Sequence, residues 1–184
     1  MVNTRVARYL APLIAAVIGV EWLRSGIEKL VASDFPNTMG KVLAAFASKN
    51  RTGWYRDFLT SSVIPHATAF GYLIEWAEVL TGVALIVTAG ILLYRSGGRI
   101  ATAAETVAGI ALLGGASMSW NFWLAAGWMS ESTDGVNLVM GLSQLVLLAG
   151  VVASLVLLWS GRSGRFSTAR TGRSGPTEST AHPA

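Results

Sequence analysis

Residues 66–94 read HATAFGYLIEWAEVLTGVALIVTAGILLY. This run is long and apolar enough to cross the hydrocarbon core of a bilayer, which takes about 20 mostly apolar helical residues. It nevertheless carries two carboxylates, Glu75 and Glu78, three residues apart. Ionisable groups at membrane depth are costly and rare, and they tend to mark a site or a pairing network. The stretch therefore predicts a membrane-spanning helix with a polar side on which function should be sought.

The composition of the whole chain also indicates a membrane protein. Of its 184 residues 52% are apolar and only 13% are charged, whereas soluble domains carry about a quarter charged residues. The apolar runs are continuous rather than alternating, which favours helices over the strands of a β-barrel. We therefore expect an all-α, four-helix transmembrane bundle within residues 1–159. Its predicted spans are 9–31, 66–94, 100–120 and 136–159.

Two segments outside these spans have compositions of their own. The connection between the first two spans has apolar residues at helical spacing, which predicts short amphipathic helices that lie on the outer membrane surface or cap the bundle. Residues 160–184 are rich in Gly, Ser, Thr, Arg and Pro, and they predict a disordered basic cytoplasmic tail. The apolar residues of the connection are Met39, Val42, Leu43 and Phe46, followed by Trp54, Tyr55, Phe58 and Leu59.

The distribution of positive charge predicts the orientation in the membrane. Arginines precede the first span, separate the second from the third and follow the fourth, whereas the connection after the third span carries acidic residues only. The positive-inside rule then places both termini in the cytoplasm and the chain in the cell membrane. Four basic residues of the first connection oppose this assignment: Lys41, Lys49, Arg51 and Arg56. We attribute the basic surface to anionic lipid rather than to nucleic acid.

The charged residues of the first two spans form the candidate site. Glu75 and Glu78 share one helix face with Gly71 and Gly82, and small residues let a neighbouring helix come close. Both acids should therefore face the bundle interior, with Arg24 of the first span as counter-ion. Two carboxylates one turn apart repel each other when both are ionised, so one should be protonated. A purely structural Arg24–Glu78 bridge beside a protonated Glu75 is an equally good interpretation.

Other polar and aromatic residues have simpler interpretations. Glu21, Arg24 and Glu28 can pair along one face of the first span, with Lys29 reaching toward the headgroups. In the fourth span, Gln144 is expected to bond across helices. Four aromatic residues near the end of the third span predict an interfacial belt, with a stacking wall for a planar ligand as the alternative. They are Trp120, Phe122, Trp123 and Trp128.

The residues that the chain lacks exclude several chemistries. Without cysteine it cannot use thiol or disulfide redox chemistry, iron–sulfur ligation or thiolate zinc. His66 has no nearby ligand set, so neither a metal nor a haem site is predicted. There is no nucleotide-binding loop, nucleophile elbow or nucleic-acid motif. Any electron transfer must therefore use a bound cofactor or a partner protein.

Three stretches of the chain resemble the DoxX family of small four-helix membrane proteins. Residues 23–30 (LRSGIEKL) are similar to the family's small-Gly-x-x-Lys element, and residues 78–85 (EVLTGVAL) to its Glu-x-x-x-Gly-x-x-Leu run. Residues 120–127 (WNFWLAAG) look like the outer loop of some members. Residues 158–161 (LWSG) stand where many members have a Gly-Leu-Asp type signature. The resemblance covers about residues 5–158.

The resemblance implies a membrane subunit of a redox complex, because the family includes the membrane subunit of thiosulfate:quinone oxidoreductase. A quinone would then bind between the first two spans. Arg24 would hold a carbonyl, Glu75 or Glu78 would relay a proton, and Trp22 or Trp76 would line the site with Arg24 and Glu78. Partners would be membrane or redox proteins and lipid. The alternative is a non-catalytic structural subunit that packs on a larger membrane complex.

Overall fold

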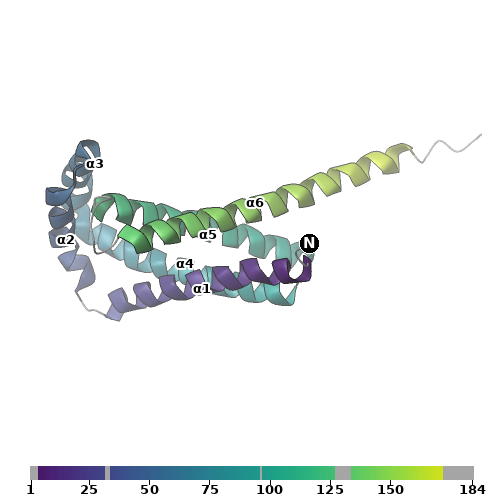
Figure 1. The fold of residues 1–184 in the computed structure, drawn as a ribbon, viewed down its shortest axis with the longest axis horizontal. Coiled ribbons are helices and arrows are strands. Elements are labelled where there is room, and N and C mark those ends of the chain that lie inside the picture. Colours follow the sequence, from purple (N-terminus) through teal and green to yellow (C-terminus); the bar gives the residue numbers. More distant parts are fainter. Residues whose placement is uncertain (1–3, 32–33, 96, 127–133, 172–184) are drawn as a thin grey trace, which may run out of the picture.

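The computed structural model describes the backbone of residues 4–31, 34–95, 97–126 and 134–171, and the side chains of 9–31, 34–95, 97–126 and 136–160. Within these residues every element is helical, and four long helices run side by side (Figure 1). The predicted all-α four-helix bundle is therefore confirmed. The long helices are α1 (Thr4–Val31), α4 (Ala67–Tyr94), α5 (Gly98–Ala126) and α6 (Asp134–Thr171).

Four segments of this structure are long and apolar enough to cross a membrane: Tyr9–Val31, Gly53–Tyr94, Gly98–Ala126 and Val136–Ser160. They contain the predicted spans, and the third continues past Trp120 to Ala126. Large apolar side chains point outward along all four, among them Val17, Leu80, Ile110 and Val146. Such a surface suits lipid and not water. The chain is a multi-pass membrane protein.

The most extensive helix contact joins α1 to α4, and glycines make it close. A Cβ atom added to Gly82 would lie 2.5 Å from the backbone nitrogen of Leu23, and one added to Gly26 would lie 2.8 Å from that of Val79. The two backbones therefore approach to a distance that a side chain at either glycine would prevent. The contact fixes the axial offset of α1 against α4, and with it the choice of side chains that meet.

Two shorter helices lie across one end of the bundle (Figure 1), as the periodicity of the first connection predicts. They are α2 (Phe35–Lys49) and α3 (Gly53–Phe58). A π-helical turn, η1 (Leu59–Val63), and a 3-10 turn, η2 (Ile64–His66), then lead into α4. Pro65 has no amide hydrogen and its ring crowds the preceding turn, so these irregular turns stand where a regular α-helix would clash.

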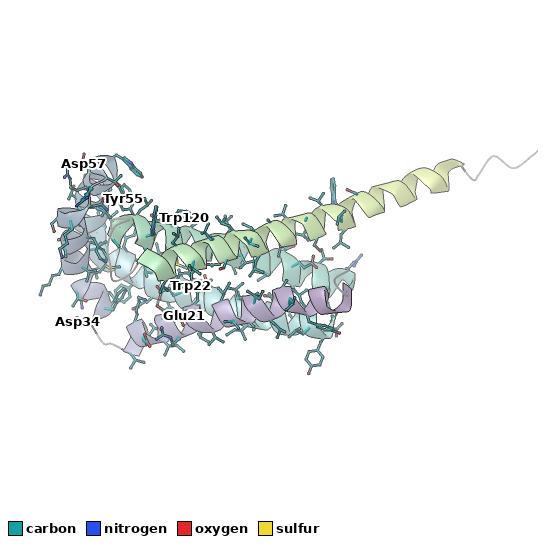
Figure 2. The ribbon with its side chains drawn as sticks, in the orientation of Figure 1. Glu21, Trp22, Asp34, Tyr55, Asp57 and Trp120 are labelled. Atoms are coloured by element: carbon teal, nitrogen blue, oxygen red, sulfur yellow. The ribbon has the colours of Figure 1, made fainter. Side chains whose placement is uncertain are left out.

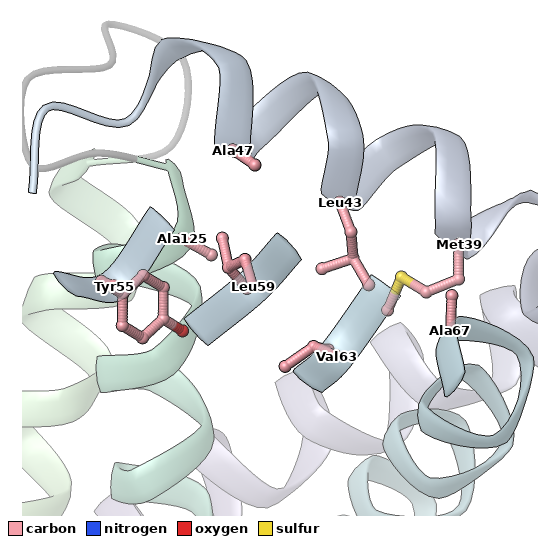
Figure 3. Packing of buried hydrophobic residues seen from close by; sticks show 8 residues of the cluster. All are labelled: Met39, Leu43, Ala47, Tyr55, Leu59, Val63, Ala67 and Ala125. Carbon is pink, nitrogen blue, oxygen red and sulfur yellow. The ribbon is translucent and has the colours of Figure 1, made fainter. Parts of the chain in front are cut away.

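A buried apolar cluster attaches α2 and α3 to the bundle (Figure 3). The buried face of α2 carries Met39, Leu43 and Ala47, whereas Val42 of the predicted face is 41% exposed. Asn50, at the end of α2, donates from Nδ2 to the backbone oxygens of Leu124 at 2.6 Å and Ala125 at 3.2 Å. This side chain satisfies carbonyls that the end of α5 leaves unpaired. The remaining members of the cluster are Tyr55, Leu59, Val63, Ala67 and Ala125.

Helix α6 extends beyond the other three (Figure 1) and ends at Thr171. The helix as described includes residues 160–171 of the predicted tail, and 172–184 lie outside the described residues, so the disordered tail stays a prediction. Extending an existing helix costs little compared with starting one. Within its span α6 packs mainly on α5 and touches α1 only slightly.

Candidate functional site

A buried ion pair joins α1 to α4 near the end of the bundle that α2 covers. The Lys29 Nζ atom lies 2.6 Å from Glu78 Oε2 and donates a second hydrogen bond to Ser25 Oγ at 2.8 Å. The Glu78 side chain is 1% exposed and that of Lys29 is 23% exposed. Lys29 also lies over the ring of Phe35, 5.5 Å from its centroid. The Lys29 ammonium is thus the counter-ion of the Glu78 carboxylate inside the bundle.

Glu75 lies one turn from Glu78 on the same face of α4 and is also buried, at 4% exposure. The prediction that the two acids face the bundle interior is therefore confirmed. Among the described residues Glu75 has no hydrogen-bond or ion-pair partner at its carboxyl group. Its role as a proton relay stays a prediction.

The structure places Arg24 elsewhere than predicted. Its guanidinium binds Glu21 through two hydrogen bonds, at 2.6 and 3.2 Å, and also binds Glu28. All three side chains lie on the outer face of α1, where that of Arg24 is 55% exposed. The predicted Arg24–Glu78 bridge is therefore wrong, and Lys29 takes the place of Arg24. The interpretation of Glu21, Arg24 and Glu28 as a self-neutralising set fits this geometry.

The two predicted tryptophans lie on different helices, Trp22 on α1 and Trp76 on α4, and they differ in exposure. Trp76 points away from the bundle and is 51% exposed. Trp22 is buried and points from α1 toward α6 (Figure 2), where its Nε1 donates to Gln144 Oε1 at 3.1 Å. Gln144 Nε2 in turn donates to Ser119 Oγ at 3.3 Å and to the backbone oxygen of Met140 at 3.0 Å. The prediction that Gln144 bonds across helices is confirmed.

Replacing Gln144 by leucine is expected to lower the free energy of unfolding by about 1–3 kcal/mol, because it leaves the buried Trp22 N–H without an acceptor. Adding Trp22→Phe to the same chain should recover part of the loss, since no donor is then orphaned. Denaturation in detergent micelles followed by circular dichroism measures both effects. Val139→Ala, on the exposed face of α6, is the control. A loss no larger than that of Val139→Ala would contradict the assigned bond.

Lys29 forms part of the wall of a half-open cavity of about 550 Å³. The cavity lies beneath α2 and α3 and between α4 and α5, and its lining is predominantly apolar. Sites for small organic molecules typically have this volume, an apolar lining and a few polar groups. Phe122 lines this cavity and its ring lies 6.5 Å from that of Trp22, whereas Trp128 lies outside the described residues. The other aromatic residues of the lining are Phe35, Phe46, Tyr55, Phe58 and Phe70.

The polar groups of this cavity differ in how many of their hydrogen-bond donors already have acceptors within the protein. Tyr55 Oη lies 3.2 Å from Asn121 Oδ1, and Asn121 Nδ2 donates to the backbone oxygen of Ser117 at 2.8 Å. An ammonium has three N–H donors, and Lys29 uses two of them within the described structure. Beyond those two acceptors the ammonium faces the Phe35 ring, and its third N–H has no hydrogen-bond acceptor among the described residues. The prediction that Lys29 reaches toward the headgroups is wrong, because its ammonium pairs with the buried Glu78. Its position, three residues after Gly26 and seven after Trp22, puts it on the face of α1 that packs inward.

Comparison of the chain with protein-family models, curated proteins and solved structures finds no match. The resemblance to the DoxX family therefore stays a prediction. Within the described residues no three His, Cys, Asp or Glu side chains come close enough together to hold a metal ion. The Lys29–Glu78 pair and the cavity beside it are the features of this site that could bind a ligand.

Proposed function

We propose that this membrane protein is a subunit of a redox complex and binds a quinone in the cavity lined by Lys29. The observation that carries the proposal is the buried Lys29–Glu78 pair at the wall of an apolar cavity of about 550 Å³. A quinone matches these surroundings in three respects: its ring is planar, its carbonyl oxygens accept hydrogen bonds, and its isoprenoid tail is apolar. The DoxX resemblance points to the same class of ligand.

In this proposal the residues of the chain bind and orient the ligand. Lys29 donates its third N–H to a ring carbonyl, while Glu78 keeps the ammonium charged and in place. Aromatic side chains, including Phe35 and Phe122, contact the faces of the ring. Glu75, one turn away, is the candidate proton relay. Electrons come from a partner protein, because the chain has no cysteine and we predict no redox centre in it, so any oxidoreductase activity belongs to the complex.

The site proposed here differs from the one that the sequence predicts. Arg24 and Trp76 lie on the outer surface of the bundle, at 55% and 51% exposure, and neither lines the cavity. Glu78 keeps its predicted place, and Lys29 replaces Arg24 as the cation. Trp22 supports the cavity from behind through its contact with Phe122.

Calorimetric titration of the purified protein in lipid nanodiscs with a short-chain quinone is expected to show saturable binding. Leu43→Trp, which fills the cavity from α2, should weaken binding at least tenfold. The double variant Lys29→Met/Glu78→Met, which removes the donor without leaving a lone buried charge, should weaken it by a similar factor. Arg24→Gln and Trp76→Phe are the matched controls and should bind as the wild type does.

Two results would contradict this proposal. The first is the absence of saturable binding in the wild type. The second is weaker binding in Arg24→Gln or Trp76→Phe with unchanged binding in the cavity variants. That result would place the quinone on the outer face of α1 and α4.

A second candidate function is a structural subunit of a larger membrane complex, and the packing of α6 favours it. Only 11% of the residues in its most apolar stretch are buried within the structure, against 28–39% in the other three spans. Most of the surface of α6 is therefore left for lipid or another protein. Purification from native membranes distinguishes the two functions. A structural subunit would copurify in fixed ratio with partners, would carry no quinone, and would leave their activity unchanged when Lys29 and Glu78 are neutralised.

The orientation of the bundle is also a proposal. The start of α1, Arg95 at the end of α4 and Arg99 at the start of α5 belong to the end of the bundle opposite α2 and α3 (Figure 1). We place this end and both termini in the cytoplasm, following the positive-inside rule, with the chain in the cell membrane. The quinone cavity then opens near the outer leaflet.

A further inference from the structure

A second, half-open cavity of about 500 Å³ lies toward the opposite end of the bundle and shares no lining residue with the first. All four long helices contribute to its wall. Small residues create much of the space, among them Ala11 and Ala15 of α1, Ala108 of α5 and Gly150 of α6. No aromatic side chain lines it, and the function proposed above leaves it unused.

Two opposite charges, Glu105 and Arg95, line this second cavity and do not neutralise each other. Glu105 is partly buried, and its Oε2 accepts a hydrogen bond from Ser154 Oγ at 3.1 Å. Among the described side chains no Lys, Arg or His nitrogen lies within 4.0 Å of the Glu105 carboxylate, and Arg95 likewise has no ion pair. Arg95 follows the end of α4 and is exposed.

The surroundings of the two charges decide which of them a ligand would complement. Water solvates the exposed guanidinium of Arg95, so an added anion gains little there. The Glu105 carboxylate is partly withdrawn from water and has a single neutral donor, so a cation beside it gains more from the lower local dielectric. The apolar walls favour a ligand whose charge is attached to a hydrocarbon body.

We propose that the second cavity binds a lipophilic organic cation, with Glu105 as its counter-ion. The cation's apolar groups pack against the small residues of α1, α5 and α6. Ser154 holds the Glu105 carboxylate on the α6 side of the cavity. This binding is independent of the quinone site, because the two cavities lie at opposite ends of the bundle.

Equilibrium dialysis of radiolabelled tetraphenylphosphonium against the full-length protein in nanodiscs tests the proposal. This probe keeps its charge at every pH and has no hydrogen-bond donor. Glu105→Gln, which keeps the shape of the side chain and an acceptor for Ser154, should weaken binding at least tenfold. Arg95→Gln should change it by less than twofold. Lys29→Met/Glu78→Met should bind as the wild type does, so that failure of the quinone proposal leaves this result unaffected.

Empty nanodiscs measure partition of the probe into lipid, and circular dichroism checks that each variant is folded. If Glu105→Gln does not fold, Ala15→Leu decides instead: it adds bulk at a buried lining position of α1 without changing a charge and should weaken binding at least fivefold. Equal binding to the wild type and to the folded test variant would overturn the proposal. Saturable binding of dodecyl phosphate that Arg95→Gln abolishes would also overturn it and would assign the cavity to an anionic amphiphile.

Discussion

Gly82→Val is expected to lower the free energy of unfolding by at least about 3 kcal/mol. Over-packing a well-packed site typically costs about 1–3 kcal/mol, and the cost is highest where the neighbouring atoms cannot move. A Cβ atom at this position would lie 2.5 Å from the Leu23 nitrogen and 2.7 Å from the Gly19 oxygen, and both are backbone atoms. They can move only if α1 moves away from α4. Since α1 carries Trp22 and Lys29, the separation would also disrupt both buried polar contacts of that helix.

Gly90→Val is the matched control for this prediction, since Gly90 lies in the same helix and a Cβ there meets nothing within 4 Å. It tests the effect of valine on α4 without the helix contact. Unfolding by a denaturing detergent, followed by circular dichroism, compares the two variants. Equal stability of Gly82→Val and Gly90→Val would show that α1 and α4 do not meet as the structure describes.

Lys29→Met is expected to cost about 3–5 kcal/mol, because removing one partner of a buried ion pair leaves the other charge uncompensated. Here the charge left behind is Glu78, at 1% exposure. The double variant Lys29→Met/Glu78→Met should regain most of this loss, because apolar side chains of similar size need no counter-ion. The same unfolding assay measures both, and the difference between the single and double variants reports the pairing.

Arg24→Met is the matched control on the same helix. The Arg24 side chain is exposed and its partners belong to α1 itself, so its loss should change stability little. A larger loss in Arg24→Met than in Lys29→Met would contradict the assignment of Lys29 as the interior cation. So would a double variant that is as unstable as Lys29→Met alone.

The sequence predicts the architecture because lipid makes strong demands on composition. Hydrophobic length determines the four spans, and helical periodicity locates α2 and α3. The glycines one turn from Glu75 and Glu78 indicate which face of α4 packs inward. The cross-helix bond of Gln144 follows from the cost of burying an unsatisfied amide in the bundle.

The sequence does not predict which cation meets Glu78, because that depends on the axial offset between two helices. Arg24 and Lys29 are five residues apart, which is about 7.5 Å along a helix at 1.5 Å per residue. The contacts of Gly26 with Val79 and of Gly82 with Leu23 fix this offset. Arg24 and Lys29 also point in directions about 140° apart around α1, at 100° per residue. The cavity could not be predicted from the four spans alone, because α2 and α3, which lie outside the spans, form part of its wall.

Photoaffinity labelling with an azido-quinone tests the central claim most directly, because it reports where the ligand lies. Mass spectrometry of the cross-linked protein in nanodiscs is expected to find the label on α2, between Phe35 and Phe46, and on α5 near Phe122. An excess of unmodified quinone should suppress it. Label confined to the outer face of α1 and α4 around Arg24 and Trp76, or unaffected by competing quinone, would contradict a quinone site beside the Lys29–Glu78 pair.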